Sequence, residues 1–295
     1  MGRKIKIFDS TLRDGAQGEG IAFSLEDKLN IVKTLDELGL DYIEAGNPFS
    51  NPKDLEFFER VSRMELKHAT LVAFGSTRRK NTPVEEDGNC EALLRAGAPA
   101  VAVFGKSWDL HVTDVIRTTL EENLSMISDT CRFFKEHGKE VIFDAEHFFD
   151  GCKNNRTYAM ESLRAAAEGG ADVLALCDTN GGSFPDEIAQ IVGEVVAAFP
   201  SVSVGIHAHN DGGMAVANSI LAVEAGASHV QGTFLGFGER TGNANLSTIM
   251  ADLQLKRGYG CIPPENMSSL TDCAIRMAEN TTVTLHKGTP FVGRS

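Results

Sequence analysis

An alternation of strands and helices is the feature of this sequence that most constrains its fold. Short apolar runs recur eight times, and an amphipathic helical run follows each of them. The eight runs that predict strands are residues 4–8, 41–46, 70–76, 100–105, 140–147, 172–179, 202–209 and 229–234. They are apolar at successive positions, as parallel strands covered by helices are. The pattern therefore predicts an α/β protein with a parallel sheet.

Eight strand–helix units fit within residues 1–258, which is close to the usual length of a (β/α)8 barrel. A doubly wound sheet is the alternative, but the first strand lacks the Gly-x-Gly-x-x-Gly turn that marks many such folds. We therefore predict a TIM barrel over residues 1–258. A C-terminal extension, residues 259–295, should add one more helix over residues 266–280.

Composition and charge restrict the partners of this chain. It has 295 residues, of which 42% are hydrophobic and 23% charged, and its net charge is −13. This excess of negative charge argues against general nucleic-acid binding and is compatible with small-molecule partners. The alternative is that the charge only keeps the protein soluble. The six cysteines form no Cys-x-x-Cys pair, and no run has the roughly 20 apolar residues of a membrane span. Residues 1–12 lack the apolar stretch of a signal peptide and predict the first strand. We expect a cytoplasmic protein that binds neither nucleic acid nor membrane.

Two histidines end the seventh predicted strand, in the stretch "GIHAHND". Side chains alternate along a strand, so His207 and His209 point to the same face. Two neutral imidazoles on one face form half of a metal site or a hydrogen-bonded part of the core. This stretch alone leaves both interpretations open.

The predicted barrel brings further polar residues near these histidines. Active sites in this fold lie at the carboxyl ends of the strands, and the eighth strand lies between the seventh and the first. The ends of the first and eighth strands carry Asp9, Arg13, Asp14, Gln17, Glu239, Arg240, Asn243 and Asn245. A carboxylate, two imidazoles and an amide oxygen at a barrel mouth favour a divalent metal site over a purely structural pair of histidines.

Five motifs at the strand ends resemble a known family: "DSTLRDGAQ", "DAEHFFDG", "CDTNGG", "GIHAHND" and "GFGERTGNANL". Together they are similar to the acyl-CoA-condensing synthases of the DRE-TIM metallolyase superfamily, which include 2-isopropylmalate, homocitrate and (R)-citramalate synthases. The resemblance runs from Lys4 to the last residue. It implies the metal ligands Asp14, His207, His209 and Asn243. The metal would be Mg²⁺, Mn²⁺ or Zn²⁺, and the sequence does not choose among them.

Within this family the loops resemble most those of (R)-citramalate synthase, in "GEGIAFSLEDKL", "NPKDLEFFE", "VAFGSTRRKN" and "FGKSWDLHV". The resemblance implies a condensation of acetyl-CoA with a 2-oxo acid, followed by thioester hydrolysis. We expect pyruvate as the acceptor, because Phe74 and Phe104 end strands where they narrow the site. Asn47 stands where the family has a tryptophan, in a loop that helps to form the acceptor pocket. A 2-isopropylmalate or homocitrate synthase, acting on another 2-oxo acid, is the alternative.

The chemistry of such a condensation gives roles to four further residues. The methyl group of a thioester is weakly acidic, so the reaction needs a base and a group that stabilises developing negative charge. We expect Arg13 to stabilise the oxyanion, Glu146 to act as acid or base, and Gln17 and Thr179 to bind the substrate. The alternatives are a structural ion pair for Arg13, support of the metal or of Arg13 for Glu146, and a turn or helix cap for Thr179.

Two charged segments near the predicted strand ends have roles other than direct catalysis. The basic run at residues 77–80 follows the third predicted strand of an otherwise acidic chain. It would attract the phosphates of CoA, or it is simply a solvated surface. Glu239 and Arg240 are expected to fix a turn beside Asn243 rather than to take part in catalysis.

The resemblance also carries expectations about the whole protein. It implies a homodimer that serves branched-chain amino-acid biosynthesis, and a chain that stops at the start of a linker whose continuation is missing. An enzyme of the 3-hydroxy-3-methylglutaryl-CoA lyase type is a rival, but "GFGERTG" stands where such lyases carry a Gly-Cys-Pro-Tyr loop. A non-catalytic metal-binding barrel is a second rival, against which the full set of polar strand ends argues.

Overall fold

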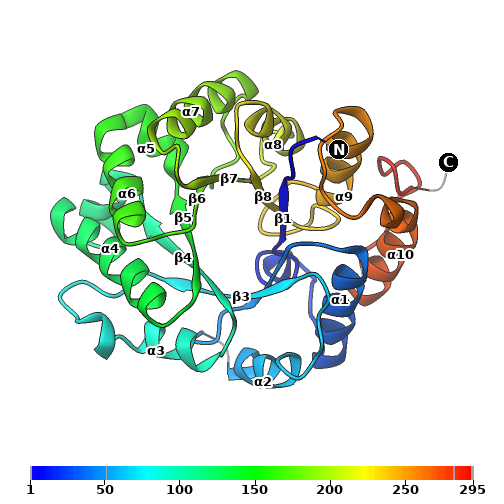
Figure 1. The fold of residues 1–295 in the computed structure, drawn as a ribbon, viewed down its shortest axis with the longest axis horizontal. Coiled ribbons are helices and arrows are strands. Elements are labelled where there is room, and N and C mark those ends of the chain that lie inside the picture. Colours follow the sequence, from blue (N-terminus) through cyan, green and yellow to red (C-terminus); the bar gives the residue numbers. More distant parts are fainter. Residues whose placement is uncertain (1, 51, 282, 294–295) are drawn as a thin grey trace.

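The computed structural model describes residues 2–50, 52–281 and 283–293. Its strands are β1 (Lys6–Asp9), β2 (Tyr42–Gly46), β3 (Thr70–Ser76), β4 (Ala100–Lys106), β5 (Glu140–Glu146), β6 (Val173–Asp178), β7 (Ser203–Ala208) and β8 (His229–Gly232). All are parallel and pair in sequence order, and the barrel closes because β8 also pairs with β1. The helices lie outside this ring (Figure 1). The predicted (β/α)8 fold is confirmed.

Helices connect the strands. They are α1 (Leu25–Leu38), α2 (Pro52–Val61), α3 (Gly88–Arg95), α4 (Leu120–Glu136), α5 (Phe148–Asn154), α6 (Arg156–Glu168), α7 (Pro185–Ala198), α8 (Ala215–Glu224), α9 (Leu246–Ala251) and α10 (Leu270–Thr281). Short 3₁₀ or π turns cover Gly15–Gln17, Val84–Glu86, His111–Val115, Asp252–Lys256 and Pro264–Ser269. The sequence pattern did not predict α5. This helix starts directly after His147, whose φ of 54° turns the chain sharply away from β5.

The starts of several helices follow from local chemistry. At α1 the side chain of Ser24 accepts a hydrogen bond from the backbone N–H of Asp27, whose carboxylate accepts one from the N–H of Ser24. Asp87 and Thr119 cap α3 and α4 in a similar way, by accepting from N–H groups of the first turn. Because each helix begins after a strand has ended, these caps also order the loops around the barrel mouth.

The interior of the barrel changes from apolar to polar along the strands. A cluster of Phe8, Tyr42, Val72, Ala100, Ala102, Ile142, Val173 and Ala175 forms a packed floor. Two positions further along the same strands, buried polar side chains point to the same interior: Glu44 follows Tyr42, and Asp144 follows Ile142. The carboxyl ends of the strands therefore enclose a polar space that rests on an apolar floor.

The C-terminal extension packs against α1. The predicted helix is present as α10, which lies beside α1 (Figure 1). Arg276 of α10 pairs with Glu37 at 2.8 Å, and the side-chain amide of Asn266 donates to the carbonyl of Leu38. Residues 282, 294 and 295, which belong to the predicted start of a linker, lie outside the described residues.

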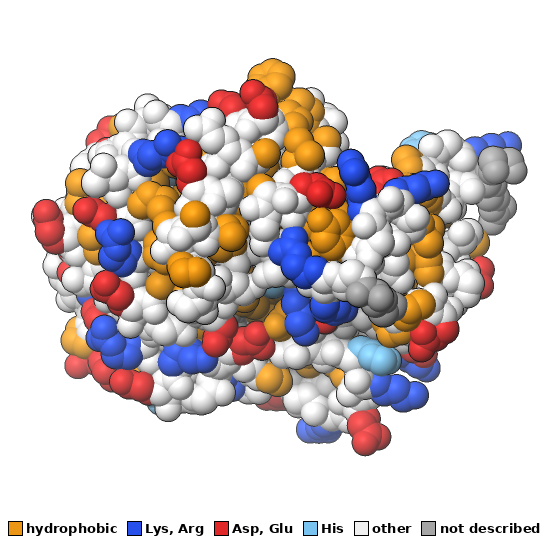
Figure 2. Space-filling model, turned by 45° about the horizontal axis from the view of Figure 1, so that its top comes forward, with side chains coloured by type: hydrophobic (Ala, Val, Ile, Leu, Met, Phe, Trp, Pro, Cys, Tyr) orange, Lys and Arg blue, Asp and Glu red, His pale blue; other side chains and the backbone are white. Residues whose placement is uncertain are grey.

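The surface carries both signs of charge. Figure 2 shows acidic and basic side chains interspersed over the face that it draws, with apolar groups between them. Among the described helices, none combines the length and the apolarity needed to cross a membrane.

Candidate metal centre and substrate pocket

Three buried side chains converge at the barrel mouth: Asp14 from the loop after β1, and His207 and His209 from the end of β7. Nε2 of His207 lies 3.4 Å from Oδ2 of Asp14, and Nε2 of His209 lies 3.7 Å from the same oxygen. One ligand atom from each residue lies within 4.8 Å of the other two. The structure thus brings three of the four predicted ligands to one point.

The orientation of His207 is set from behind by Gln231 of β8. Nδ1 of His207 lies 2.8 Å from Oε1 of Gln231, and Nε2 of Gln231 donates to Oδ1 of Asp144 at 2.9 Å. Because the amide nitrogen of Gln231 is used by Asp144, its oxygen accepts the Nδ1 proton of His207. In the neutral imidazole the proton then lies on Nδ1, and Nε2 is the nitrogen with a free lone pair, as a metal ligand requires.

Asn243 lies against this cluster from the loop after β8. Its Nδ2 donates to Oδ1 of Asp14 at 3.0 Å, and its Oδ1 is buried without a hydrogen-bond partner among the described residues. Two glycines permit this close approach. A Cβ at Gly238 would lie 2.2 Å from Nδ2 of Asn243, and Gly242 has a φ of +94°. An unsatisfied amide oxygen therefore accompanies the three converging residues.

The surroundings of Asp14 and His209 favour the forms of these two side chains that bind a cation, whereas Asp14 raises the pKa of His207. Burial acts to raise the pKa of the Asp14 carboxyl, but the charge of Arg13 and the interactions with His207 and His209 hold it well below its ordinary range. Burial and the neighbouring His207 lower the pKa of His209 to about 4. Near pH 7, Asp14 is therefore ionised and His209 neutral, as metal ligands must be.

These residues fit a divalent cation. Two imidazole nitrogens and one carboxylate oxygen make a mixed donor set of the kind that first-row divalent metals accept. The orphaned amide oxygen of Asn243 is a candidate for a further ligand or for a contact to a bound water. Three protein ligands leave positions open for a substrate.

Arg13 is held beside the cluster by two acidic residues. Its Nε donates to Glu44 at 2.7 Å, its Nη1 donates to Asp14 at 3.0 Å, and its guanidinium lies 3.9 Å from the centre of the Phe74 ring. Glu44 is fully buried on β2 and also accepts from the hydroxyl of Ser10. The ion pair that was the alternative for Arg13 is thus present, and Arg13 also lines the cavity described next.

A cavity of about 270 Å³ opens above these residues. Its lining consists of Arg13, Asp14, Gln17, Phe74, Phe104, Asp144, Glu146, Cys177, Thr179, His207, His209 and Glu239. Nine of the eleven predicted site residues are therefore brought together. The other two, Asn47 and Asn243, are not among the lining residues, and Asn243 lies behind Asp14.

The side chain of Asn47 stabilises the turn in its own loop. Its side-chain oxygen accepts hydrogen bonds from the backbone N–H groups of Phe49 and Ser50, and its backbone N–H donates to Asp54. Such a turn is typical of asparagine. The described contacts of Asn47 therefore lie within the β2–α2 connection and not in the cavity.

Two carboxylates of β5 face the cavity in different surroundings. Glu146 forms an ion pair with Lys106 of β4. Asp144 is buried more deeply, and burial together with the charge of Glu44 raises its pKa to about 6. The sequence argument selected Glu146 and left out Asp144. The alternation of the strand, which puts both on one face, was the available signal.

Thr179 and Arg240 connect the segments that follow β5, β6, β7 and β8. The Thr179 hydroxyl accepts from the backbone N–H of His147 at 2.9 Å, and its carbonyl accepts from Arg240 at 2.7 Å. Arg240 also binds both carboxylate oxygens of Asp211, at 2.8 and 2.9 Å. The expected pair of Arg240 with Glu239 is present at 3.3 Å, but Asp211 is the closer partner.

Comparison with known proteins places this barrel in a family. The sequence profile of the HMGL-like family matches residues 4–278. The chain belongs to the HMGL-like family. Two relatives of this HMGL-like chain are (R)-citramalate synthases. The synthase of Aquifex aeolicus is 55% identical over 100% of this chain and 56% of its own length. That of Synechocystis is 50% identical over 98% of this chain and 54% of its own length. Proteins named as 2-isopropylmalate or homocitrate synthases match at 34–35% identity.

The family resemblance inferred from the motifs is confirmed, and the likeness to citramalate synthases exceeds that to the other synthases. The chain spans about half of the length of the citramalate synthases that it matches. Among solved structures, the HMG-CoA lyase of Bacillus subtilis superposes on the HMGL-like barrel with a TM-score of 0.78, covering 94% of each chain at 22% identity. At that identity the likeness supports the fold alone.

Proposed function

We propose that this chain carries the catalytic barrel of a metal-dependent synthase that condenses acetyl-CoA with a small 2-oxo acid. Pyruvate is the proposed acceptor, and citramalate is the product after thioester hydrolysis. The proposal rests on the convergence of Asp14, His207 and His209 beside Arg13, in a chain 55% identical to an (R)-citramalate synthase. A homodimer, a cytoplasmic location and a role in branched-chain amino-acid biosynthesis belong to the same proposal.

A divalent cation would be held by Asp14, His207 and His209, with Asn243 as the fourth candidate ligand. When bound, it supplies Lewis-acid polarisation of the acceptor's oxo group. Arg13 supplies a permanent positive charge at the same cavity. Its Nε and Nη1 are used by Glu44 and Asp14, and no described hydrogen bond uses Nη2. That nitrogen is the donor proposed for the substrate's carboxylate or for the developing oxyanion.

The reaction needs a base that removes a proton from the methyl group of acetyl-CoA. The carbanion then forms a carbon–carbon bond to the ketone carbon, the ketone oxygen becomes a hydroxyl, and water cleaves the thioester so that CoA leaves as a thiol. Glu146 is the proposed base, because its carboxylate lines the cavity and is held there by an ion pair with Lys106. Gln17 and Thr179, on the same walls, are proposed to bind the acceptor.

The size of the cavity supports a small acceptor. Phe74 and Phe104 stack with ring centres 5.3 Å apart and form one wall of a cavity of about 270 Å³. Rings in contact leave little freedom to accommodate a branched side chain. We therefore expect pyruvate to react faster than 2-oxoisovalerate or 2-oxoglutarate.

The decisive experiment follows CoA thiol release from acetyl-CoA with each of these three 2-oxo acids, in the presence of Mg²⁺, Mn²⁺ or Zn²⁺ and again with a chelator. Pyruvate with a divalent metal should give the highest rate, and the chelator should abolish it. Preference for 2-oxoisovalerate would move the protein to the isopropylmalate synthases. Release of thiol from none of the three would refute the synthase proposal.

A further inference from the structure

The bottom of the substrate pocket is formed by a hydrogen bond that crosses the barrel. Asp144 lies on β5 and Gln231 on β8, and Nε2 of Gln231 donates to Oδ1 of Asp144 at 2.9 Å. β5 and β8 are separated by two strands on one side and by four on the other, so this bond spans the interior. The apolar floor, to which Ile142 of the same strand belongs, lies beneath it. A substrate that reaches down into the pocket therefore meets Asp144.

Asp144 is a buried carboxylate without a cation. Asp14 and Glu44, two other buried carboxylates near the pocket, both pair with Arg13. Asp144 makes no ion pair within residues 2–50, 52–281 and 283–293, and its hydrogen-bond donor there is the neutral amide of Gln231. A charge buried in this way costs stability, so Asp144 is a candidate for a functional group.

The charge of Asp144 is present near neutral pH. Burial and the charge of Glu44 raise the pKa of this carboxyl to about 6. At pH 7.5 it is therefore mostly ionised. A divalent cation held nearby by Asp14, His207 and His209 would favour the ionised form further.

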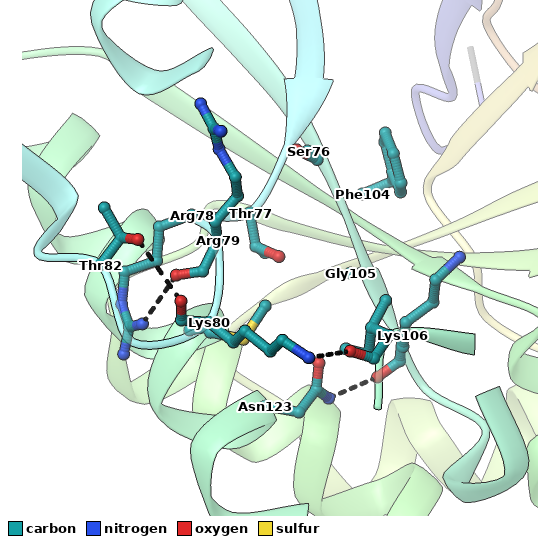
Figure 3. Close-up of a pocket in the computed structure, with 12 residues that line it drawn as sticks. Ser76, Thr77, Arg78, Arg79, Lys80, Thr82, Phe104, Gly105, Lys106 and Asn123 are labelled. Atoms are coloured by element: carbon teal, nitrogen blue, oxygen red, sulfur yellow. Dashed lines mark hydrogen bonds between the residues drawn. The ribbon is translucent and has the colours of Figure 1, made fainter. Parts of the chain in front are cut away.

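The described residues that line the substrate pocket offer no cation near Asp144. Arg13 is the only lysine or arginine among them, and it is paired on the side of the metal centre. The basic side chains of residues 78–80 line a separate cavity of about 450 Å³, which shares Phe104 with the substrate pocket. Figure 3 shows the Phe104 ring apart from these basic groups. Lys106 lines that cavity too and is paired with Glu146. The bottom of the substrate pocket thus presents an uncompensated negative charge.

The substituent of a bound 2-oxo acid would be directed toward this charge. The acceptor's carboxylate and oxo group suit Arg13 and the metal centre, so the remaining substituent points away from both. The mouth has to stay open for the second substrate, which leaves Asp144 and the Phe104 wall, paired in the register of β4 and β5. We propose that Asp144 determines the class of acceptor, because its buried charge rejects 2-oxo acids that carry a second carboxylate and admits those with an uncharged chain. This inference rests on the proposed function.

Volume alone does not make this distinction. The pocket of about 270 Å³ is close to the roughly 300 Å³ at which pockets for drug-sized ligands begin, so it has room for a linear chain longer than that of pyruvate. A linear dicarboxylate such as 2-oxoglutarate is therefore excluded by charge and not by length.

The test is calorimetric titration of the whole chain, loaded with Mn²⁺ at pH 7.5, with pyruvate, 2-oxovalerate and 2-oxoglutarate. The last two have carbon chains of equal length, which end in a methyl group and in a carboxylate. The parent should bind 2-oxoglutarate about tenfold or more weakly than 2-oxovalerate, because like charges a few ångströms apart repel strongly in a buried site. In Asp144→Asn the ratio of these two affinities should fall by about tenfold.

This variant separates the charge of Asp144 from its structural contact. The amide has nearly the size of the carboxylate, and its oxygen can still accept the hydrogen bond from Gln231. A merely structural role of Asp144 would therefore leave the ratio unchanged. Asp144→Ser is a second uncharged variant, which should lower the ratio too and replaces the first if that does not fold. Asp186→Asn, at an exposed position of α7 outside the pocket, is the matched control and should keep the parent's ratio.

The outcomes separate this inference from the proposed function. If the parent binds 2-oxoglutarate as tightly as 2-oxovalerate, Asp144 does not select the acceptor, and a parent that binds none of the three acids refutes both proposals. If the ratios change as expected but no 2-oxo acid makes the protein release thiol, the synthase proposal fails while the role of Asp144 stands. If pyruvate gives thiol release but both uncharged variants keep the parent's ratio, the synthase proposal stands and the role of Asp144 is refuted.

Discussion

Two buried histidines on neighbouring strands, His207 on β7 and His229 on β8, have opposite surroundings. In the barrel's register His229 lies opposite Gly205, and His207 lies opposite Gln231, so the two imidazoles are one inward-facing level apart. Nδ1 of His207 is hydrogen-bonded to Gln231, and Nε2 of His207 lies 3.4 Å from Asp14. Neither nitrogen of His229 has a hydrogen-bond partner among the described residues. Its ring packs instead against Phe8 and Tyr42, at 5.4 and 5.5 Å.

The pKa values of the two rings differ accordingly. Burial lowers the pKa of His229 to about 3. Burial acts on His207 in the same direction, but the hydrogen bond and the charge of Asp14 outweigh it and raise the pKa of His207 above its ordinary value. Both histidines are buried, but His229 packs as an uncharged ring in the barrel floor, whereas His207 is a candidate metal ligand at the barrel mouth. What differs is whether a carboxylate lies beside the ring: Asp14, from the loop after β1, is close to His207.

The largest effect should come from removing an imidazole at the mouth. His207→Ala should weaken divalent-metal binding by more than the roughly 10–100-fold that is typical when a residue behind a ligand is lost. Competition titration with a metal-binding dye measures this affinity. His229→Leu is the control at the floor and should bind metal as the parent does. Equal metal affinity in parent and His207→Ala would remove the distinction between the two histidines.

The next largest effect concerns the charge beside the cluster. Arg13→Lys keeps the positive charge but not the fork that reaches both Glu44 and Asp14. Thiol release with pyruvate should fall by about 100-fold, as when one oxyanion donor is lost. A thermal melt should show that the variant folds, because the buried Glu44 still has a cation nearby. Full activity in a folded Arg13→Lys protein would confine Arg13 to the structural ion pair.

Gln231, which lies opposite His207, gives a smaller effect. Gln231→Leu removes the acceptor that fixes the proton of His207 on Nδ1, so metal affinity should fall by about 10–100-fold. Gln190→Leu, at an exposed position of α7, is the matched control and should leave metal affinity unchanged. If both variants bind metal equally well, the orientation of His207 does not depend on β8.

The smallest effect is a pH dependence at the floor. The unfolded chain protonates His229 near its ordinary pKa of 6.5, whereas the folded protein does so only near 3. Stability should therefore fall as the pH drops below 6.5, and it should do so less in His229→Leu. Between pH 7 and 5 the parent should lose about 2 kcal/mol more unfolding free energy than the variant, since one pKa unit is worth about 1.4 kcal/mol.

Urea titration at both pH values, with a chelator present to remove any bound metal, measures this difference. His68→Leu changes an exposed histidine and should behave as the parent does at both pH values. A parent and a His229→Leu variant with the same loss of stability would mean that His229 finds a partner, such as a buried water, in solution.

Much of the candidate site follows from one rule about this fold together with the family resemblance. The rule predicts that polar residues at the ends of the first, seventh and eighth strands meet, and the resemblance selected Asp14 among them; the structure places Asp14 beside His207 and His209. Glu44 and Gln231 were not predicted. Each lies inside an apolar strand. The partner of Glu44 is Arg13 in the loop after β1, and the partner of Gln231 is His207 on β7, and only the folded structure shows these pairs.

The sequence by itself determined the eight strand–helix units, and thereby the closed barrel and the end of it that carries the site. These are consequences of local periodicity, which each segment shows without the rest. Only the tertiary structure decided which polar atoms meet. Asp14 and Asn243 are 229 positions apart in the sequence and share a hydrogen bond of 3.0 Å. Asn47 follows β2 directly, but its side chain bonds within its own loop. Burial and charge act over a few ångströms of space, so the properties of His207 and His229 are set by the closure of the barrel and not by their neighbours in the chain.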